Sequence, residues 1–235
     1  MIVGGGDGTL AGVAQAFIDS DATLGVLPLG TGNSFAQTLA IPLDLEGAIE
    51  TILAGHTERV DLGMVNDRIF VNAASIGLSV VVARRTAGAL KRILGPGAYL
   101  VTGAIEAWRH RSFRGTLVLD GIERTFRTQQ IIITNGRFFG TTPLGDAQQV
   151  TSDRLLVLTL EGTTTWGLAR FWGAMLAGHP EWLSEVRIES AREVRVTSRP
   201  HRSIELDGEV RARTPATFSV LPKALRVYVP GSAAR

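Results

Sequence analysis

The sequence predicts two parts, an α/β domain followed by a β-rich sandwich domain. The first observation is that two short apolar segments, 2–3 and 24–29, each precede a glycine-rich turn and a helical pattern. The second is a change after Val60 to short strand-like segments with turn residues between them. The third is that 45% of the 235 residues are hydrophobic, which suffices for the cores of two domains. We expect the α/β domain at 1–62 and the β-rich domain at 63–222. A last strand within 223–235 could return to the first domain.

The first glycine-rich turn, residues 4–9 (GGGDGT), lies between a strand end and the helical apolar pattern of residues 10–18. Such a turn points several backbone N–H groups into one space, beside the positive end of the helix dipole, and its small residues let a phosphate approach. Asp7 repels phosphate, so it fits best beside a divalent cation that bridges protein and phosphate oxygens. The alternative is an ordinary strand-to-helix turn with a capping Asp.

A second glycine-rich turn, residues 30–36 (GTGNSFA), directly follows the strand predicted at 24–29. Thr31 and Asn33 can donate hydrogen bonds to phosphate, and Asn33 or Ser34 can cap the next helix. Because both turns follow strands, their amides meet at the sheet edge where open α/β sheets bind ligands. The glycine spacing matches neither a Walker P-loop nor a dinucleotide fingerprint. We therefore predict one phosphate cradle built from two turns.

The remaining elements follow from periodicity and turn residues. Leu45, Ile49, Ile52 and Leu53 form a third helical stripe that Gly55 ends, and Asp120-Gly121 predicts a hairpin turn. Helices are expected near 97–111 and 165–177. Strands are expected at 68–74, 115–119, 129–134, 155–160, 186–189, 194–197, 203–206, 217–220 and 225–229.

Composition excludes several classes of protein and site. The net charge of +2 permits contact with an anionic membrane surface but does not indicate a nucleic-acid partner. The sequence has no cysteine, its four histidines lack metal-ligand spacing, and no apolar run approaches the roughly 20 residues that span a bilayer. No basic-apolar signal peptide opens the sequence. We therefore expect a cytoplasmic protein.

Several stretches, taken in order, resemble the catalytic family of the diacylglycerol kinases, the lipid kinases that include sphingosine and ceramide kinases. The stretches are GGDGTL (5–10), LGVLPLGTGNSFA (24–36), RVDLG (59–63), FVN (70–72), AYL (98–100), NGR (135–137) and LDGE (206–209). The resemblance covers nearly the whole chain. It implies a Rossmann-like or phosphofructokinase-like nucleotide-binding domain, ATP and Mg²⁺ as cofactors, and diacylglycerol or a related lipid alcohol as the acceptor.

The resemblance also assigns roles to residues. It makes Asp207 the base that removes the proton of the lipid hydroxyl, with Asp7 as the second catalytic residue and Glu209 as the lesser alternative base. Asp7 and Asp61 are the candidates for the metal network, although Asp61 also reads as a turn residue before Gly63. As a bare pattern, Asp207-Gly208 also reads as a hairpin turn. The implied nucleotide-binding residues are Gly5, Gly6, Asp7, Gly8, Thr9, Gly30, Thr31, Gly32 and Asn33.

A structural Mg²⁺ site is implied at Asp153, together with the backbone carbonyls of Val150 and Leu155. Two departures from the family pattern bear on it: Arg154 replaces the usual Gly, and residues 142–146 differ from the usual Gly-rich loop. Ser34 also stands where the family frequently has an Asp, which removes one carboxylate from the metal network.

Three points remain open at the level of sequence. Lys91 and Arg92 can reach a phosphate or remain solvated, and the aromatic residues of 166–182 favour core packing over insertion into a membrane. The family usually carries an earlier strand–helix segment before the first turn, so this sequence reads as a fragment or a short form, with an edge strand that permits a homodimer. The alternatives to a lipid kinase acting peripherally at a membrane are an NAD kinase-like enzyme and an inactive lipid- or nucleotide-binding remnant.

Overall fold

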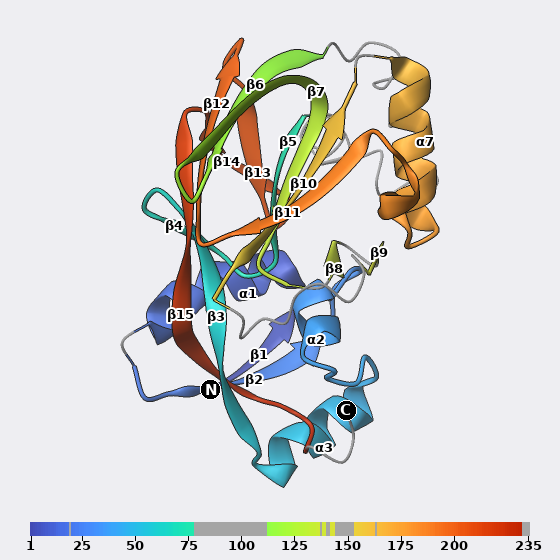
Figure 1. Ribbon diagram of the computed structural model, residues 1–235. Helices are drawn as coiled ribbons and strands as arrows, with labels where there is room; N and C mark the ends of the chain where they lie inside the picture. Colours follow the sequence, from blue (N-terminus) through green and yellow to red (C-terminus); the bar gives the residue numbers. More distant parts are fainter. Residues whose placement is uncertain are drawn as a thin grey trace.

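The computed structural model describes residues 1–18, 20–77, 112–136, 138–139, 142–143, 153–162 and 164–231. Within these residues the chain forms an α/β unit and a larger β-rich unit, which lie one above the other in Figure 1. The predicted fold class is confirmed. The predicted helix near 97–111, together with Lys91, Arg92 and Val150, lies outside the described residues.

The α/β unit is formed by the first 54 residues and the end of the chain. Strands β1 and β2 pair in parallel, each followed by a glycine-rich turn and a helix. The helices cover a core that joins residues near both termini, including Leu10, Phe35 and Val227. Its elements are β1 (Ile2–Gly5), α1 (Asp7–Ala14), η1 (Gln15–Phe17), β2 (Thr23–Pro28), α2 (Ser34–Thr38) and α3 (Leu45–Ala54).

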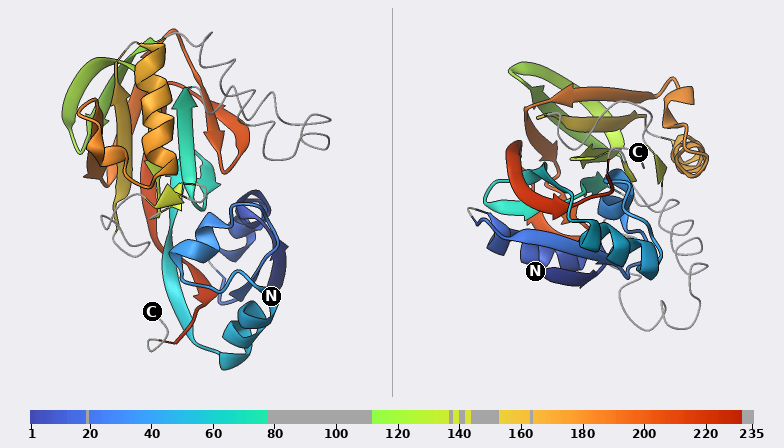
Figure 2. Two further views of the ribbon diagram at one scale, coloured as in Figure 1. Left: turned by 90° about the vertical axis from the view of Figure 1, so that its right-hand side faces the viewer. Right: turned by 90° about the horizontal axis from the view of Figure 1, so that it is seen from below.

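The β-rich unit is mainly antiparallel. Helix α7 (Thr165–Leu176) lies along one face of the sheet, and its buried side chains Leu168, Phe171 and Met175 pack against β7 and β10 (Figure 2). The strands and the short helix η2 of this unit are β4 (Arg68–Phe70), β5 (Ala73–Gly77), β6 (Phe113–Leu119), β7 (Ile122–Thr134), β8 (Phe138–Phe139), β9 (Thr142–Pro143), β10 (Leu155–Glu161), η2 (Pro180–Trp182), β11 (Val186–Ala191), β12 (Glu193–Arg199), β13 (Ser203–Leu206) and β14 (Glu209–Arg213).

Two long strands run through both units. Strand β3 (Thr57–Val65) pairs antiparallel with β15 (Ala216–Tyr228) along most of its length. The first residues of β15 pair with β12, whereas Arg226 and Val227 pair in parallel with β2. A break in register between Leu221 and Leu225 lies midway along β15. As a result, the strands of both units belong to one sheet, apart from β8 and β9, which pair only with each other.

The helix predicted from the stripe at residues 45–53 is present as α3, but of the four apolar residues of the stripe only Ile52 packs on the sheet. The large apolar side chains of the stripe are exposed by 51%, 42% and 79% at Leu45, Ile49 and Leu53. The buried side chains are the smaller Ala48 and Thr51. A Cβ atom added to Gly25 of β2 would lie 2.9 Å from Ile52 Cδ1, so a glycine in the sheet allows this close approach.

The preference for core packing of the aromatic residues near α7 is only partly correct. Phe171 is fully buried and Trp172 is half-buried, but Trp166 and Trp182 are exposed by 73% and 71%. Trp166 lies in the first turn of α7 and Trp182 lies in η2, so neither lies on the helix face that packs on the sheet. None of the helices in the described part of the chain is long and apolar enough to span a membrane.

Candidate active site

The two glycine-rich turns touch each other at the carboxyl edge of β1 and β2. A Cβ atom on Gly30 would lie 2.4 Å from the Cα atom of Gly6, so neither turn leaves room for a side chain there. The side chain of Asn33, which has a left-handed backbone with φ of 50°, fixes the second turn. Its Oδ1 accepts from the N–H of Gly30 at 2.8 Å, and its Nδ2 donates to the carbonyls of Pro28 and Gly30. Asn33 therefore shapes the turn, and its role as a phosphate ligand stays a prediction.

Asp7 joins the two turns. Its carboxylate accepts hydrogen bonds from the N–H groups of Ser34 at 3.0 Å and Phe35 at 2.9 Å, the first two residues of α2. The predicted capping of α2 by Asn33 or Ser34 is therefore wrong, because the cap comes from the other turn. A carboxylate bound to a helix N-terminus is also favoured by the helix dipole.

The other residues of the predicted phosphate cradle lie near the hydrogen bonds between Asp7 and the start of α2. Thr9 donates its N–H to the carbonyl of Gly6, and a Cβ atom on Gly5 would lie 2.6 Å from Thr9 Cβ. The Thr31 side chain is exposed, and the carbonyl of Gly32 accepts from Gln37 Nε2. The structure thus brings the two predicted turns together as one feature.

Asp207 lies at the tip of the β13–β14 hairpin, with φ of 46°. Its carboxylate accepts three backbone hydrogen bonds, from Val71 at 2.8 Å and from Asn72 and Ala73 at 3.0 Å each. These donors come from a break between β4 and β5, where the sequence predicted one continuous strand over 68–74. The break has a physical reason, because backbone groups that leave the ladder need another partner and the carboxylate supplies it.

The Asp207 carboxyl group is set up to exchange a proton near neutral pH. Burial raises its pKa from 3.8 to about 7, the three backbone N–H groups oppose this rise, and the negative charge of Asp7 adds to it. The backbone also places the hairpin against α1, since a Cβ atom on Gly8 would lie 3.4 Å from the carbonyl oxygen of Asp207. The two predicted catalytic aspartates are therefore neighbours where the hairpin meets α1. Glu209 is exposed and pairs with Arg211.

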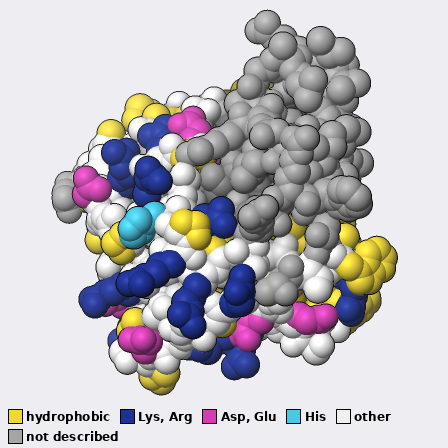
Figure 3. All heavy atoms as spheres, turned by 90° about the horizontal axis from the view of Figure 1, so that it is seen from above, with side chains coloured by type: hydrophobic (Ala, Val, Ile, Leu, Met, Phe, Trp, Pro, Cys, Tyr) yellow, Lys and Arg dark blue, Asp and Glu magenta, His cyan; other side chains and the backbone are white. Residues whose placement is uncertain are grey.

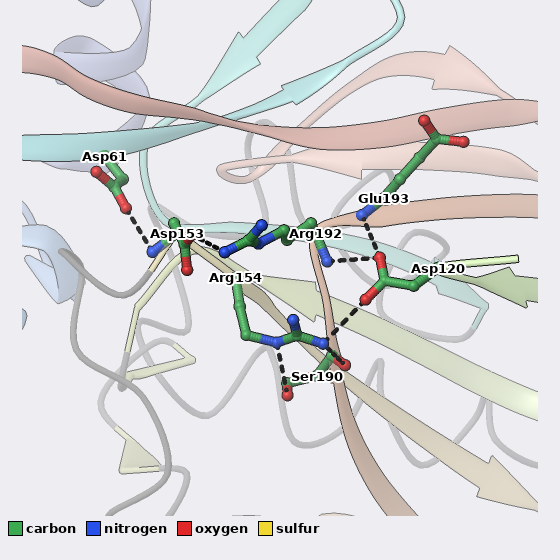
Figure 4. Close-up of polar contacts among 7 residues, drawn as sticks. All are labelled: Asp61, Asp120, Asp153, Arg154, Ser190, Arg192 and Glu193. Carbon is green, nitrogen blue, oxygen red and sulfur yellow. Dashed lines mark hydrogen bonds and ion pairs between the residues drawn. The ribbon is translucent and has the colours of Figure 1, made fainter.

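Asp61 lies at a second junction, shown in Figure 4. It is 3% exposed, and its carboxylate accepts from the N–H groups of Asp153 at 2.9 Å and Lys223 at 2.8 Å. These bonds tie β3 to the irregular part of β15 and to the segment before β10. Asp61 thus has a structural task, and its place in a metal network stays a prediction.

The implied metal site near Asp153 is described only in part. The Asp153 carboxylate pairs with Arg192 at 2.5 Å, and Leu155 is the buried first residue of β10 (Figure 4). Arg154, which replaces the usual Gly, donates to Asp120 Oδ2 and to the carbonyl of Ser190. No group of three or more His, Asp or Glu side chains able to hold a metal ion occurs among the described residues. Val150, the third predicted ligand, lies outside them.

Two further residues contribute to the site without having been assigned a role from the sequence. Asn135 is 2% exposed, donates its Nδ2 to the carbonyl of Asp61 at 2.8 Å and donates its N–H to the carbonyl of Asn72. Glu205 accepts from Ser75 Oγ at 3.1 Å, and burial raises its pKa. For Glu205 the only sequence signal is its position two residues before Asp207 in a strand pattern.

Comparisons with protein families agree with the order of the two units. Residues 1–65 match the model of the diacylglycerol kinase catalytic domain. Residues 72–229 match the model of the YegS C-terminal NAD kinase beta sandwich-like domain.

Individual relatives extend over almost the whole chain. An uncharacterized protein of Synechocystis is 31% identical over 98% of this chain, and the chain spans 54% of its length. A diacylglycerol kinase of Staphylococcus aureus strain Newman is 28% identical over 98% of this chain, which spans 74% of that protein. A crystal structure of a diacylglycerol kinase from Bacillus anthracis has the same fold, with a TM-score of 0.78 and 22% identity over 99% of this chain and 78% of that one.

Proposed function

Because the chain belongs to the diacylglycerol kinase family, a family of lipid kinases, we propose that it transfers the γ-phosphoryl group of ATP to the hydroxyl of diacylglycerol or a related lipid alcohol. The observation that carries this proposal is the carboxyl group of Asp207, whose pKa burial raises and which lies near Asp7, the residue that joins the two glycine-rich turns.

Asp207 would act as the general base. A base works best when its pKa lies near the working pH, and burial raises the pKa of Asp207 to about 7. In the proposed step the hydroxyl proton of the lipid passes to Asp207, the hydroxyl oxygen forms a bond to the γ-phosphorus, and the bond from that phosphorus to the bridging oxygen breaks. The backbone N–H groups of residues 71–73 hold the carboxylate in position for this transfer.

The glycine-rich turns fit the phosphates of a nucleotide. A methyl group at Gly30 would clash with Gly6, so both turns need glycine at this contact. Without side chains there, a phosphate could come close to the backbone N–H groups. The N–H groups of Asp7 and Gly8 lie too early in α1 to have an acceptor within the helix, so they would be available to a phosphate, whereas Thr9 already donates to the carbonyl of Gly6. Together these donors would hold the β- and γ-phosphates.

Mg²⁺ is the cation that we propose here, because it prefers carboxylate oxygens and water as ligands. Each carboxylate oxygen of Asp7 accepts one amide hydrogen bond and keeps a lone pair for a cation or its bound water. When bound, Mg²⁺ would neutralise charge on the transferring phosphoryl group. Asp7 also positions α2 relative to the first turn, so it would link the cation to the phosphate cradle.

We further propose that the protein meets its lipid peripherally at a membrane on the cytoplasmic side. The support is the row of exposed residues on the outer face of α7, where Arg170 is the charged member. Trp166 and Leu176 lie on this face, 73% and 75% exposed, and Trp182 of η2 follows it. Exposed Trp side chains favour the membrane–water interface.

A phosphoryl-transfer assay tests the proposal. Diacylglycerol, sphingosine and NAD are offered separately in mixed micelles with Mg²⁺ and ATP labelled at the γ-phosphate. We expect a labelled lipid from the wild type and a rate lower by about 10²–10⁴-fold for Asp207→Asn. Asp67→Asn, a matched change of an exposed residue in the β3–β4 turn, should keep the wild-type rate.

Two results would contradict the lipid kinase. Labelled NAD without labelled lipid would favour the NAD kinase-like alternative. Absence of any product from a folded protein that still binds ATP in calorimetry would favour the binding-only alternative.

A further inference from the structure

The outer face of β6, β7 and β12 carries a hollow of about 850 Å³ that lies outside the candidate active site. On the upper face of the molecule, Lys and Arg side chains gather beside the grey atoms (Figure 3). The residues that line it include Arg114, Thr116, Thr125, Thr197, Arg199 and His201.

Strand register places three arginines in one row across this face. Arg114 of β6 pairs directly with Arg127 of β7 on one side and with Arg199 of β12 on the other. Directly paired residues point to the same face of a sheet, and all three side chains are exposed. The row therefore concentrates positive charge along one edge of the hollow.

The repulsion among these three arginines lowers the stability of the sheet unless negative charge lies beside them. Like charges directly opposite each other on neighbouring strands destabilise a sheet. No ion pair joins Arg114 or Arg199 to a carboxylate in the part of the chain that the structure describes. General basicity does not explain the row, because the whole chain has a net charge of only +2.

The loop that carries Arg199 and His201 is held in place from below. The buried hydroxyl of Ser198 hydrogen bonds with that of Thr214 at 2.6 Å and donates to the carbonyl of Pro200. Thr214 in turn accepts from the N–H of Arg202 at 2.9 Å. The cationic wall of the hollow is thus preorganised, which lowers the cost of binding.

The floor of the hollow supplies hydroxyl groups. Thr125, Thr116 and Thr197 form the next row of direct pairs across the same three strands. The hydroxyls of Thr116 and Thr125 hydrogen bond at 2.8 Å, which uses one of their two protons and leaves the other to donate. One acidic side chain, Glu123, also lines the hollow, but it pairs with Val118, four residues along β6 from Arg114, and Glu193 approaches Arg195 instead of the arginine row.

We propose that this hollow is a second binding site, which takes a phosphate-bearing ligand between Arg114 and Arg199 over the threonine floor. Guanidinium groups bind phosphate oxygens through paired, charge-assisted hydrogen bonds, and the threonine hydroxyls add neutral donors. The phosphate can belong to a soluble compound or to a lipid headgroup. The proposal does not rest on the kinase activity, because it concerns binding at a separate face.

The test compares the wild type with R114Q/R199Q, which removes two cations from exposed positions. A control variant, R68Q/R187Q, makes the same change in net charge on β4 and β11. Calorimetry measures binding of inorganic phosphate and of glycerol 3-phosphate. Co-sedimentation measures binding to phosphatidylcholine vesicles with and without phosphatidate.

We expect R114Q/R199Q to lower the affinity by about tenfold or more, as the loss of charge-assisted hydrogen bonds implies, with the control variant unchanged. Selective loss of phosphate or glycerol 3-phosphate binding identifies a soluble ligand, and selective loss of vesicle binding alone identifies a lipid headgroup. Equal binding by the two variants, or no binding by the wild type in either assay, would overturn the proposal. So would binding of a single-stranded oligonucleotide alone, since that assigns the face to nucleic acid.

Thermal unfolding supplies a second readout. Without phosphate, R114Q/R199Q should melt at or above the temperature of the wild type, because the variant relieves repulsion between neighbouring strands. Phosphate should then raise the melting temperature of the wild type and of the control variant, but not that of R114Q/R199Q. A lower melting temperature without phosphate would show that the arginines stabilise the sheet on their own and would count against a ligand site.

Discussion

Asp207 and Asp61 lie at two junctions of the molecule, and backbone N–H groups from other segments bind the carboxylate of each. Asp207 also lies close enough to Asp7 for the second negative charge to raise its pKa further, and it faces the glycine-rich turns. Asp61 instead connects β3 with β15 and with the segment before β10. The comparison shows that amide contacts alone do not distinguish the two carboxylates, and that the neighbouring charge of Asp7 is what sets Asp207 apart.

The two junctions are not independent. Asn135 donates its side chain to the carbonyl of Asp61 and its N–H to the carbonyl of Asn72. Asn72 in turn donates its N–H to Asp207. A disturbance at the structural junction therefore has a short covalent and hydrogen-bonded route to the proposed base.

The largest expected effect concerns the pH dependence of stability at Asp207. Its pKa is 3.8 in the unfolded chain and about 7 in the folded protein, so the folded state binds more protons between these values. Below a pH of about 4 the carboxyl group does not change the unfolding free energy. As the pH rises from about 4 to about 7 it lowers the unfolding free energy progressively, and above about 7 the loss is complete. Relative to Asp207→Asn, the wild type should lose about 2–4 kcal/mol of unfolding free energy over this range. Urea unfolding at several pH values measures the difference, and a difference that stays constant with pH would be the contrary result.

The next effect is expected at Asp61. Asp61→Ala leaves the N–H groups of Asp153 and Lys223 without their acceptor, which should lower the unfolding free energy by about 2–4 kcal/mol. Asp67→Ala, in an exposed turn, is the control and should change it by no more than about 0.5 kcal/mol. Denaturant titration measures both. If Asp61→Asn shifts the Mg²⁺ concentration that activity requires, Asp61 also belongs to the metal network.

A smaller loss is expected at the contact between the glycine-rich turns. Gly30→Ala places a methyl group 2.4 Å from the Gly6 Cα atom, so the turns must separate, at a cost of about 1–3 kcal/mol. ATP binding, measured by calorimetry, should weaken with it. Gly12→Ala in α1 meets no atom within 4 Å and should instead stabilise the protein by about 0.5–1 kcal/mol. Unchanged ATP binding in Gly30→Ala would separate the turns from the nucleotide.

The smallest effect is expected at the exposed pair of Asp153 and Arg192. Asp153→Asn should change the unfolding free energy by less than about 1 kcal/mol in the absence of Mg²⁺, because solvent screens such pairs. The implied metal site adds a second outcome: Mg²⁺ should raise the melting temperature of the wild type but not of the variant. Equal shifts in both proteins would remove Asp153 from the metal ligands.

Local patterns predicted the parts of the molecule that local sequence controls. The two strand–turn–helix units, α7 and the hairpin turn at Asp207 follow from glycine positions and apolar periodicity. The break after Phe70 was missed, because Val71 continues an apolar strand pattern and the acceptor that compensates the break lies 136 residues later. The structural task of Asp61 was hidden for the same reason, since one of its donors is Lys223, 162 residues away.

Side-chain direction was the second limit. The sequence shows that Asn33 follows a glycine turn, but only its left-handed backbone reveals that the side chain folds back onto Gly30. The stripe on α3 has the right period, yet the helix buries Ala48 and Thr51 and brings only Ile52 of the stripe against Gly25 of the sheet. Glu205 had no motif, and its burial depends on the pairing of β13 with β5.

The passage of β3 and β15 through both units has a consequence for cooperativity. Unfolding of either unit removes pairing partners from β15, which the other unit also needs, so we expect neither unit to have a separate melting transition. A heat-capacity scan should therefore give one peak, in which the calorimetric and van't Hoff enthalpies agree. The two units are thus joined by paired strands as well as by the chain, and the break in register between Leu221 and Leu225 is the place where this connection is least regular.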